Sequence, residues 1–434
     1  MKVRCYEART YTIVNTGGTN GTSNALYTIS RVISGHINPG DTIQVSYNFT
    51  DPTFYDPNIF YSYSDVVAAY GQPFNLTTGA IQSELTLAAK FAFLNGAYQL
   101  MCVAVNPANP SAPTVGDYSA ALDKFYDQAL VAIVVPCNGS MQPLQQIVQE
   151  HVDSQSNNRF ERRAIIGMDG TVNPVSSSQR IINAQELSDE RIALVCPATF
   201  QYFSPELNID VTLGGQFMAA ALAGMVMNMS FAQPLTHKVV VGFDDVVEVE
   251  LDGQKNLESQ NGLCVVEKTR HQLIRVRHGV STDNSDMVHR EWSITGQQDA
   301  MVYRLRDFLE NANLIGQPIY DYTLVNVKAS AEAALQSLVR DGLMVNYTGL
   351  SCRQLITNPD VLEITFSWQP AFPLNYIVVT FGVSLSTGSI TAQGGPNGTT
   401  NFTSNSPNLN SQITAAGQAA FNDFGGPSNT LLSN

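Results

Sequence analysis

The feature that most constrains the fold is a repeat in which a helical stripe is followed by a short apolar strand. It runs from about Ile59 to Met229, and the strands recur at intervals of about 30 residues, the length of one βαβ unit. The expected strands are Tyr98–Val105, Leu130–Val135, Ala164–Ile166 and Ile192–Val195. Because helices separate them, these strands predict a parallel sheet covered by helices.

Apolar residues spaced three or four apart predict the helices of this repeat. The first helix is expected to end at Asn95-Gly96, a natural C-cap, and the second to begin behind Asp117 as N-cap. The four stripes are Leu85, Ala88, Ala89 and Ala92; Tyr118, Ala121, Leu122 and Phe125; Leu144, Ile147 and Val148; and Ile181, Ile182 and Gln185.

The whole chain of 434 residues is long enough for several packed cores, and its fold class is predicted as a multidomain α+β and α/β protein. Residues 1–52 form a β-rich N-terminal region with Asn-Gly and Pro-Gly turns, and residues 53–232 form the α/β domain. Residues 233–390 form a C-terminal α+β assembly domain. Residues 391–434 form a polar tail whose only charge is Asp423, and this tail is expected to be flexible.

Within residues 233–390, two amphipathic helices are expected, with the strand Tyr320–Val327 between them. The helices are built on Met301, Leu305, Phe308 and Leu309, and on Ala331, Ala334, Leu335 and Leu338. A strand follows in which Leu362, Ile364, Phe366 and Trp368 share one face. A final strand is expected at Tyr376–Val383, so helices should cover one side of an antiparallel or mixed sheet.

The loops after the predicted parallel strands are where an α/β enzyme would bind a nucleotide. They contain Pro107, Pro110, Pro136 and Pro197, and none matches G-x-G-x-x-G or a Walker A loop. Proline lacks the amide donor that a phosphate needs. No cofactor is expected, although an α/β enzyme with an unrecognised site stays open as an alternative.

Other candidates for chemistry are isolated residues. Glu248 and Glu250 share a face if residues 243–251 form a strand, which we expect to be half-buried with its valines inward and its carboxylates in water. The six histidines include no H-E-x-x-H pair, and the six cysteines include no Cys-x-x-Cys pair. We therefore expect no catalytic or metal site, and reduced thiols packed in cores.

The charge balance is 23 basic against 37 acidic residues, a net charge of −14, and no long basic tract is present. Direct binding of nucleic acid is therefore not expected. One segment is basic, and it could meet an acidic neighbour or form a solvated strand face; its cations are Lys268, Arg270, Arg275 and Arg277. The start of the chain has no apolar h-region, and the apolar stretch Phe217–Met227 is too short to span a membrane, so neither secretion nor membrane insertion is expected.

Several stretches, in their order and spacing, resemble the tail sheath proteins of contractile bacteriophages, the myoviruses, over residues 54–385. They are Tyr61–Gly71 with Gly79 and Phe93–Ala97; Gly215–Met225 with Pro234–Lys238 and Gly242-Phe243; Arg290–Asp299 with Asn313–Gly316; and Asn358–Asp360 with Phe372–Ile377. The Pro-Gly-Val-Tyr-like N-terminal arm of that family is not recognisable here. Residues 1–20, or a partner, are expected to substitute for it.

The resemblance implies a structural subunit without enzymatic activity that stacks in hexameric rings around a tail tube and contracts to drive the tube through the host envelope. Its implied partners are copies of itself, the tail tube protein, the baseplate and the tail terminator. Its implied location is the virion tail, after assembly in the host bacterial cytoplasm. The C-terminal domain would face the tube.

The resemblance also implies that terminal arms add strands to neighbouring subunits, since main-chain hydrogen bonds can persist while subunits rotate. The expected assembly residues surround the last predicted strand: Pro370, Phe372, Leu374, Asn375, Tyr376, Ile377, Val379 and Phe381. A different tail or virion structural protein, such as a tube or terminator subunit, stays open as the other alternative.

Overall fold

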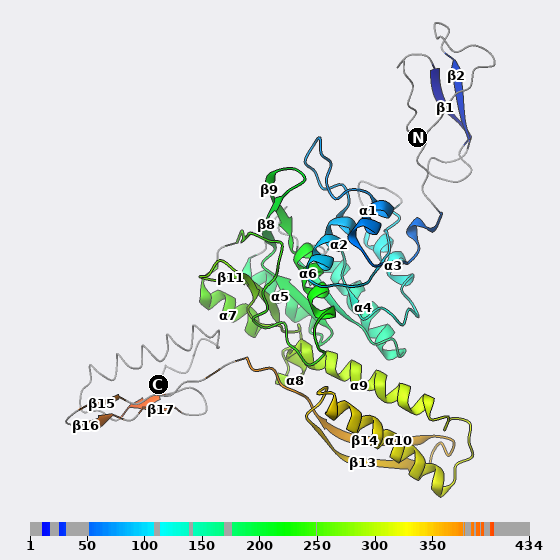
Figure 1. Ribbon diagram of the computed structural model, residues 1–434, viewed down its shortest axis with the longest axis vertical. Coiled ribbons are helices and arrows are strands. Elements are labelled where there is room, and N and C mark those ends of the chain that lie inside the picture. The colour runs from blue at the N-terminus through cyan, green and yellow to red at the C-terminus, as the bar shows by residue number, and fades with distance from the viewer. Residues whose placement is uncertain are drawn as a thin grey trace. The chain divides into compact units, whose positions relative to one another are not determined.

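The computed structural model describes residues 11–17, 26–31, 52–107, 113–138, 142–168, 176–248, 250–375, 377, 383–385, 388–390, 392–394 and 400–402 (Figure 1). The chain divides into two compact units. One comprises Met1–Asn58 and Cys102–Lys124, and the other comprises Ile59–Met101 and Phe125–Asn434. The second unit contains the central sheet and the helices of the C-terminal half.

The central sheet has five strands in the order β12-β11-β7-β6-β5. The strands are β5 (Ile133–Val134), β6 (Arg163–Gly167), β7 (Ile192–Cys196), β11 (Leu263–Lys268) and β12 (Ile274–Val276). The first four run parallel and β12 runs antiparallel to β11. Every residue of β6 and β7 is buried, so apart from Arg163 at the start of β6 their sequences are continuous apolar runs rather than alternating ones.

Three of the four predicted parallel strands lie in this sheet, as β5, β6 and β7. The prediction for Tyr98–Val105 was wrong: only β4 (Leu100–Cys102) forms there, and it pairs with β3 (Asn58–Phe60) in a separate two-stranded sheet. The fourth parallel strand is β11, which follows the predicted domain boundary at residue 232. That boundary therefore falls within one sheet, because β11 is buried between β7 and α7 and completes the core from later in the chain.

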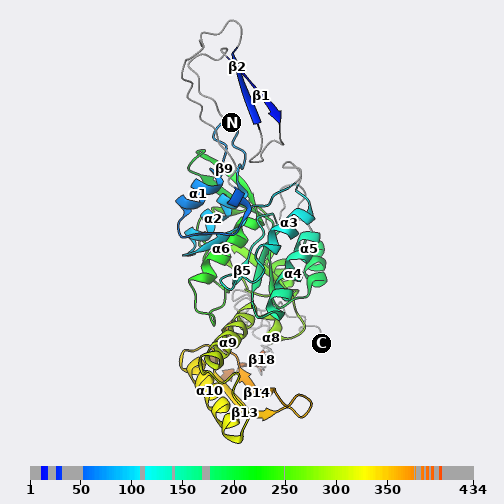
Figure 2. The same ribbon diagram turned by 90° about the vertical axis from the view of Figure 1, so that its right-hand side faces the viewer.

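Helices cover both faces of the central sheet (Figure 2). They are α2 (Glu84–Leu94), α4 (Gln142–Asn157), α5 (Ser177–Leu187), α6 (Gly215–Met227) and α7 (Asp252–Gln260). Helix α6 packs on one face with α2 outside it, and α4, α5 and α7 lie on the other. Because α6 lies between the sheet and α2, most of its residues are buried and it has little polar face.

Capping residues set the ends of two predicted helices. Helix α2 begins after Ser83, whose hydroxyl accepts from the Thr86 amide, and it ends at Asn95 before Gly96, as predicted. Helix α3 (Val115–Asp123) begins after Thr114 rather than Asp117. Asp117 is instead the third helical residue of a capping box, in which its carboxylate accepts from the Thr114 amide.

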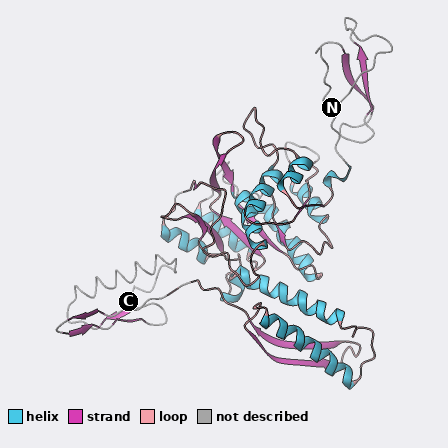
Figure 3. Cartoon of the chain, in the orientation of Figure 1, coloured by secondary structure: helices cyan, strands magenta, loops and turns pink. Residues whose placement is uncertain are grey.

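The remaining elements are smaller (Figure 3). Strands β8 (Thr199–Ser204), β9 (Ile209–Gly214) and β10 (Asp245–Val246) form an antiparallel sheet in the order β10-β8-β9, and β1 (Tyr11–Gly17) pairs antiparallel with β2 (Leu26–Arg31) in the predicted N-terminal β-region. The others are η1 (Pro52–Tyr55), α1 (Tyr63–Tyr70), α8 (Met287–Arg290), β15 (Val383–Leu385), β16 (Gly388–Ile390), β17 (Ala392–Gly394) and β18 (Thr400–Phe402).

The C-terminal module consists of α9 (Trp292–Asn311), α10 (Asp321–Arg340), β13 (Asn346–Gln354) and β14 (Leu362–Gln369). Helix α10 packs against α9 and against the β13–β14 pair, around Met301, Leu335 and Leu338. In β14, the face of Ile364, Phe366 and Trp368 is the more buried one, which confirms the predicted alternation.

The strand predicted at Tyr320–Val327 was wrong, because α10 begins at Asp321. Thr323, Val327 and Ala331 are buried at a spacing of four residues, so this segment continues the helical period of the stripe that follows it. None of the described helices combines the length and hydropathy needed to cross a membrane.

Candidate assembly site

Helix α9 connects the central α/β fold to the C-terminal module. Its first six residues, Trp292–Gln297, are buried against the central fold, whereas Ala300 and Met301, at its middle, belong to the core of the C-terminal module. A Cβ on Gly296 would collide with the guanidinium of Arg163, so glycine is needed for this close contact. The root of α9, residues 292–299, is thus part of the central core.

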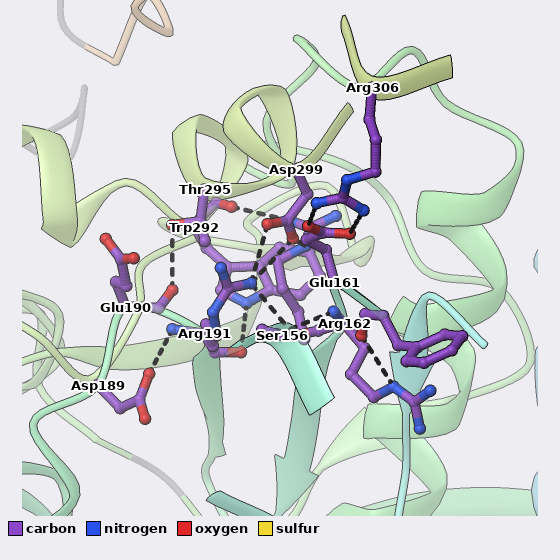
Figure 4. Close-up of polar contacts among 12 residues, drawn as sticks. Ser156, Glu161, Arg162, Asp189, Glu190, Arg191, Trp292, Thr295, Asp299 and Arg306 are labelled. Carbon is purple, nitrogen blue, oxygen red and sulfur yellow. Dashed lines mark hydrogen bonds and ion pairs between the residues drawn. The ribbon is translucent and has the colours of Figure 1, made fainter. Parts of the chain in front are cut away.

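Two arginines hold the root of α9: Arg163 of β6, and Arg191, which directly precedes β7. Figure 4 shows Arg191 against Asp299. Arg191 Nη1 lies 2.9 Å from Asp299 Oδ1, and Arg163 Nε lies 3.9 Å from Asp299 Oδ2. The guanidinium of Arg163 also stacks 3.8 Å from the Trp292 ring centroid and donates to the Trp292 carbonyl at 2.9 Å. Cation–π stacking and charge-assisted hydrogen bonds therefore act on the same turn of helix.

These charges are removed from water. Burial raises the pKa of Asp299 even though Arg191 and Arg163 favour its charged form. Burial also lowers the pKa of Arg163 to about 10, with Asp299 opposing the shift and Arg191 adding to it. A buried ion pair contributes little net stability, because the cost of desolvating two charges offsets their attraction. The pair forms only within a narrow range of distances and angles. We infer that this network of contacts fixes the position of α9.

A second contact fixes the direction of α9. Arg306, further along the helix, donates to both carboxylate oxygens of Glu161 at 2.5 and 3.2 Å and to the Arg159 carbonyl at 3.0 Å (Figure 4). Bidentate arginine–carboxylate pairs restrain angle as well as distance. With the root network, this pair gives α9 two attachment points on the central fold.

The segment after β14 returns to the root of α9. Gln297 Nε2 donates to the Ala371 carbonyl at 3.0 Å, and the Ala371 amide donates to Gln297 Oε1 at 2.8 Å. Asn375 Nδ2 donates to Glu291 Oε1 at 2.9 Å, and His278 Nε2 lies 3.0 Å from the same oxygen. Residues 371–375 are thus tied at both ends to buried side chains.

Between and beyond these ties, apolar side chains of the predicted assembly residues face solvent. Phe372 is 49% exposed, Leu374 is 78% exposed and Ile377 is 52% exposed, while Pro370 and Asn375 are half-buried. Tyr376, Val379 and Phe381 lie outside the described residues, as does most of the predicted strand Tyr376–Val383. An exposed apolar run beside a sheet is a typical protein contact surface.

The predicted basic segment is largely paired within the subunit. Arg277 is buried and contacts Glu267 at 2.6 Å, Arg275 contacts Glu267 at 2.9 Å, and Lys268 contacts Asp245 at 2.9 Å. Arg270 is exposed. The informative residue is Glu267, which directly precedes the segment and neutralises two of its arginines.

The interpretation of Glu248 and Glu250 as carboxylates in water was wrong. Both contact the buried Arg180 of α5, together with Glu258 of α7 at 2.8 Å. Only Asp245–Val246 forms a strand in this region, as β10. A buried guanidinium requires counter-charges, and it draws these carboxylates inward.

The remaining reactive residues have structural positions. Cys102, Cys196 and Cys264 are buried, which confirms for these three the prediction of thiols packed in cores, whereas Cys137 and Cys352 are half-buried. Burial raises the pKa of Cys264 to about 12. Within the described ranges, no group of three or more His, Cys, Asp or Glu side chains is arranged to hold a metal ion.

The carboxyl end of β6, where a nucleotide would be expected, is occupied by backbone. The Gly215 amide at the start of α6 donates to the Met168 carbonyl at 2.6 Å, and a Cβ on Gly167 would collide with the Gly215 backbone. The first turn of α6 therefore packs directly on the end of the strand.

No family model matches the chain. It is 50% identical over 394 residues to the tail sheath protein of Mycobacterium phage Bxz1, covering 90% of this chain and 67% of that protein. It is 22% identical over 285 residues to the tail sheath protein of Bacillus phage SP01, covering 64% of this chain and 47% of that protein. The chain thus spans about two thirds of one relative and about half of the other.

Solved structures share the fold. The contracted helical sheath of the anti-feeding prophage matches with a TM-score of 0.58 at 13% identity, over 81% of this chain and 99% of that one. The contracted sheath complex of the PVC extracellular contractile injection system matches with a TM-score of 0.57 at 14% identity, over 76% of this chain and 88% of that one. The two sequence relatives are sheath proteins, rather than the tube or terminator subunits left open as an alternative. The chain belongs to the tail sheath protein family of contractile bacteriophages.

Proposed function

We propose that this sheath subunit polymerises as stacked hexameric rings around the tail tube and shortens as a helical array to drive the tube through the host envelope. The observation that carries the proposal is the C-terminal module: a two-stranded β13–β14 sheet followed by the exposed apolar residues Phe372, Leu374 and Ile377. A two-stranded pair has two strand edges, and unpaired edges are templates for strands of another chain.

Strand addition supplies the connection between subunits. The segment Tyr376–Val383, or the chain just beyond it, provides a strand to a neighbouring module, and the β13–β14 pair receives one in return. Main-chain hydrogen bonds of this kind persist while subunits rotate, so rings stay connected during shortening. The free energy released by contraction then comes from surfaces that pack better in the contracted state than in the extended one.

The attachment of α9 supports this mechanism. Arg163, Arg191 and Arg306 fix α9 to the central fold, so the central fold and the C-terminal module move together as one body. The C-terminal module faces the tail tube, and the baseplate and tail terminator contact the two ends of the stack. The subunit acts mechanically, without catalysis, and is incorporated into the virion tail after assembly in the host cytoplasm.

Negative-stain electron microscopy of the purified protein over a range of concentrations tests the proposal. We expect wide, hollow, helically striated tubes to appear above a threshold concentration. A chain lacking residues 374–434 should remain a soluble monomer, because the donated strand is missing. Tubes of normal length from that shortened chain would contradict strand donation, and a full-length chain that stays monomeric at every concentration would contradict the sheath mechanism.

A further inference from the structure

Residues 371–375, here called the arm anchor, connect the last strand of the C-terminal module to the segment that follows it. The anchor could have lain free in solvent, because Phe372 and Leu374 are exposed. Instead it makes three hydrogen bonds to Gln297 and Glu291, whose side chains are almost completely buried. The exposed residues are thus held by their polar neighbours rather than by apolar burial.

The anchoring side chains are themselves immobilised by the central fold. Glu291 forms a β-bridge with Val280, and its carboxylate is shared with His278 and Asn375. Gln297 lies one turn beyond Ser293 in the buried root of α9, two residues before Asp299, which binds Arg191. Neither residue belongs to the core of the C-terminal module formed by Met301, Leu335 and Leu338.

These contacts define a short mechanical path. Tension on the chain beyond Asn375 acts first on the contact between Asn375 and Glu291. It then acts on the contact between Ala371 and Gln297. Through these contacts the tension reaches the root of α9. From there Arg163 and Arg191 transmit it to β6 and β7, the fully buried strands of the central sheet. The β13–β14 pair, which is held in register by its own ladder, lies outside this path.

We propose that Gln297 and Glu291 form a force-transmitting anchor, which fixes the point where the C-terminal arm leaves the subunit and passes tension from a second copy of this chain to the central sheet. The proposal rests on the function proposed above, in which this arm donates a strand. It assigns Gln297, Glu291 and Asn375 as positioning residues for the contact between subunits.

Hydrogen exchange on the isolated subunit tests the anchor without requiring assembly. In Gln297→Leu, the Ala371 amide loses its acceptor and exchange in the peptide containing residues 370–375 should accelerate roughly tenfold, the factor for one lost hydrogen bond. Asn375→Asp replaces the donating amide with a second carboxylate beside Glu291, and at neutral pH the two like charges repel each other, so the other end of the anchor should detach. Gln179→Leu makes the same chemical change on the exposed face of α5 and should leave this peptide unchanged.

Tube formation by the same variants gives the second measurement. Gln297→Leu and Asn375→Asp should retain the melting temperature of the central fold to within a few degrees, yet give tubes several-fold shorter than those of the wild type and of Gln179→Leu. Wild-type tube length with faster exchange at residues 370–375 would overturn force transmission. Unchanged exchange would overturn the anchor itself. A failure of strand donation can be distinguished from a failure of the anchor, because the chain lacking residues 374–434 would then form tubes of normal length.

Discussion

Buried charges in this subunit join one element to another. Asp299 joins α9 to Arg163 of β6 and to Arg191, which directly precedes β7, and Glu267 of β11 pairs with Arg275 of β12 and with Arg277. The cost of removing one partner exceeds the benefit of forming the pair, because the other charge is left in an apolar medium. Single substitutions at these pairs should therefore have large effects on the free energy of unfolding.

Asp299→Asn tests the pair at the root of α9. It keeps the shape of the side chain and leaves Arg163 and Arg191 without their shared counter-charge. We expect a loss of about 3 kcal/mol in the free energy of unfolding, measured by urea denaturation. Asp307→Asn, on the exposed face of the same helix, is the matched control and should change the free energy by less than about 0.5 kcal/mol. Equal effects of the two changes would contradict a special role for Asp299.

Glu267→Gln tests the pair in β11 and has a defined pH dependence. Burial favours the neutral form of Glu267, but Arg277 and Arg275 outweigh it and lower its pKa below the usual value of 4.5. A depressed carboxylate pKa contributes stability that is complete above its unfolded-state value and is lost as pH falls through the folded-state value. The free energy of unfolding of the wild type should therefore exceed that of Glu267→Gln by about 3 kcal/mol at pH 7. This difference should become smaller below about pH 4.5.

Urea denaturation of both proteins between pH 3 and pH 7 measures this difference. Glu363→Gln removes a comparable ion pair to Arg353 that is largely exposed. This substitution should lower the free energy of unfolding by less than about 1 kcal/mol, because water already screens that pair. If the difference in the free energy of unfolding between wild type and Glu267→Gln increased as the pH falls, the lowered pKa assigned to Glu267 would be contradicted.

At the scale of elements, the closest helix contact is between α2 and α6. A Cβ on Gly224 would collide with the backbone of Ala92, so the two helices approach with no side chain between them at this point. This approach gives α6 its burial on both sides and places Phe91 of α2 against Phe217 of α6 in the main core. Separation of the helices would therefore disturb the whole core.

Gly224→Ala tests this contact. Alanine favours the helix by up to about 1 kcal/mol, but overpacking costs about 1–3 kcal/mol, so the net change should be destabilising. Gly253→Ala in α7 is the control, since its Cβ would meet open space. That change should be neutral or slightly stabilising. Thermal unfolding of the two variants measures both effects, and a Gly224→Ala protein as stable as Gly253→Ala would show that the helices have room to adjust.

At the scale of the whole molecule, the strands differ in how completely the subunit itself buries them. Strands β6, β7 and β11 are almost entirely buried within the subunit, whereas β13 and β14 alternate between half-buried and exposed residues. The first set needs no neighbour to exclude water. In the function proposed above, a strand added by another chain would cover the second set.

Hydrogen exchange in monomers and assembled tubes should distinguish the two sets. Amides of β6, β7 and β11 should exchange slowly in both states. Amides of β13 and β14 should exchange at least tenfold more slowly in tubes, because added strands accept their outward hydrogen bonds. Unchanged exchange of β13 and β14 upon assembly would place the contacts between subunits elsewhere.

The sequence by itself determined the elements whose patterns are local. The strands predicted at Leu130–Val135, Ala164–Ile166 and Ile192–Val195, the C-terminal end of α2 and the alternation in β14 follow from periodicity and capping, and the sheath resemblance agreed with the relatives found. Each of these depends on residues a few positions apart, so the chain itself carries the signal. The same local reasoning failed at Tyr320–Val327, where a short apolar run fits either a strand or a helix.

Only the tertiary structure decided which distant residues meet. The place of β11 in the central sheet, the carboxylates around Arg180, the pairing of Asp299 with Arg191 and the return of Ala371 to Gln297 join positions separated by 67 or more residues. No periodicity relates such positions, because their contact depends on how complete elements pack. The contacts that hold residues 371–375 to Gln297 and Glu291 are also of that kind, so the structure was needed to locate them.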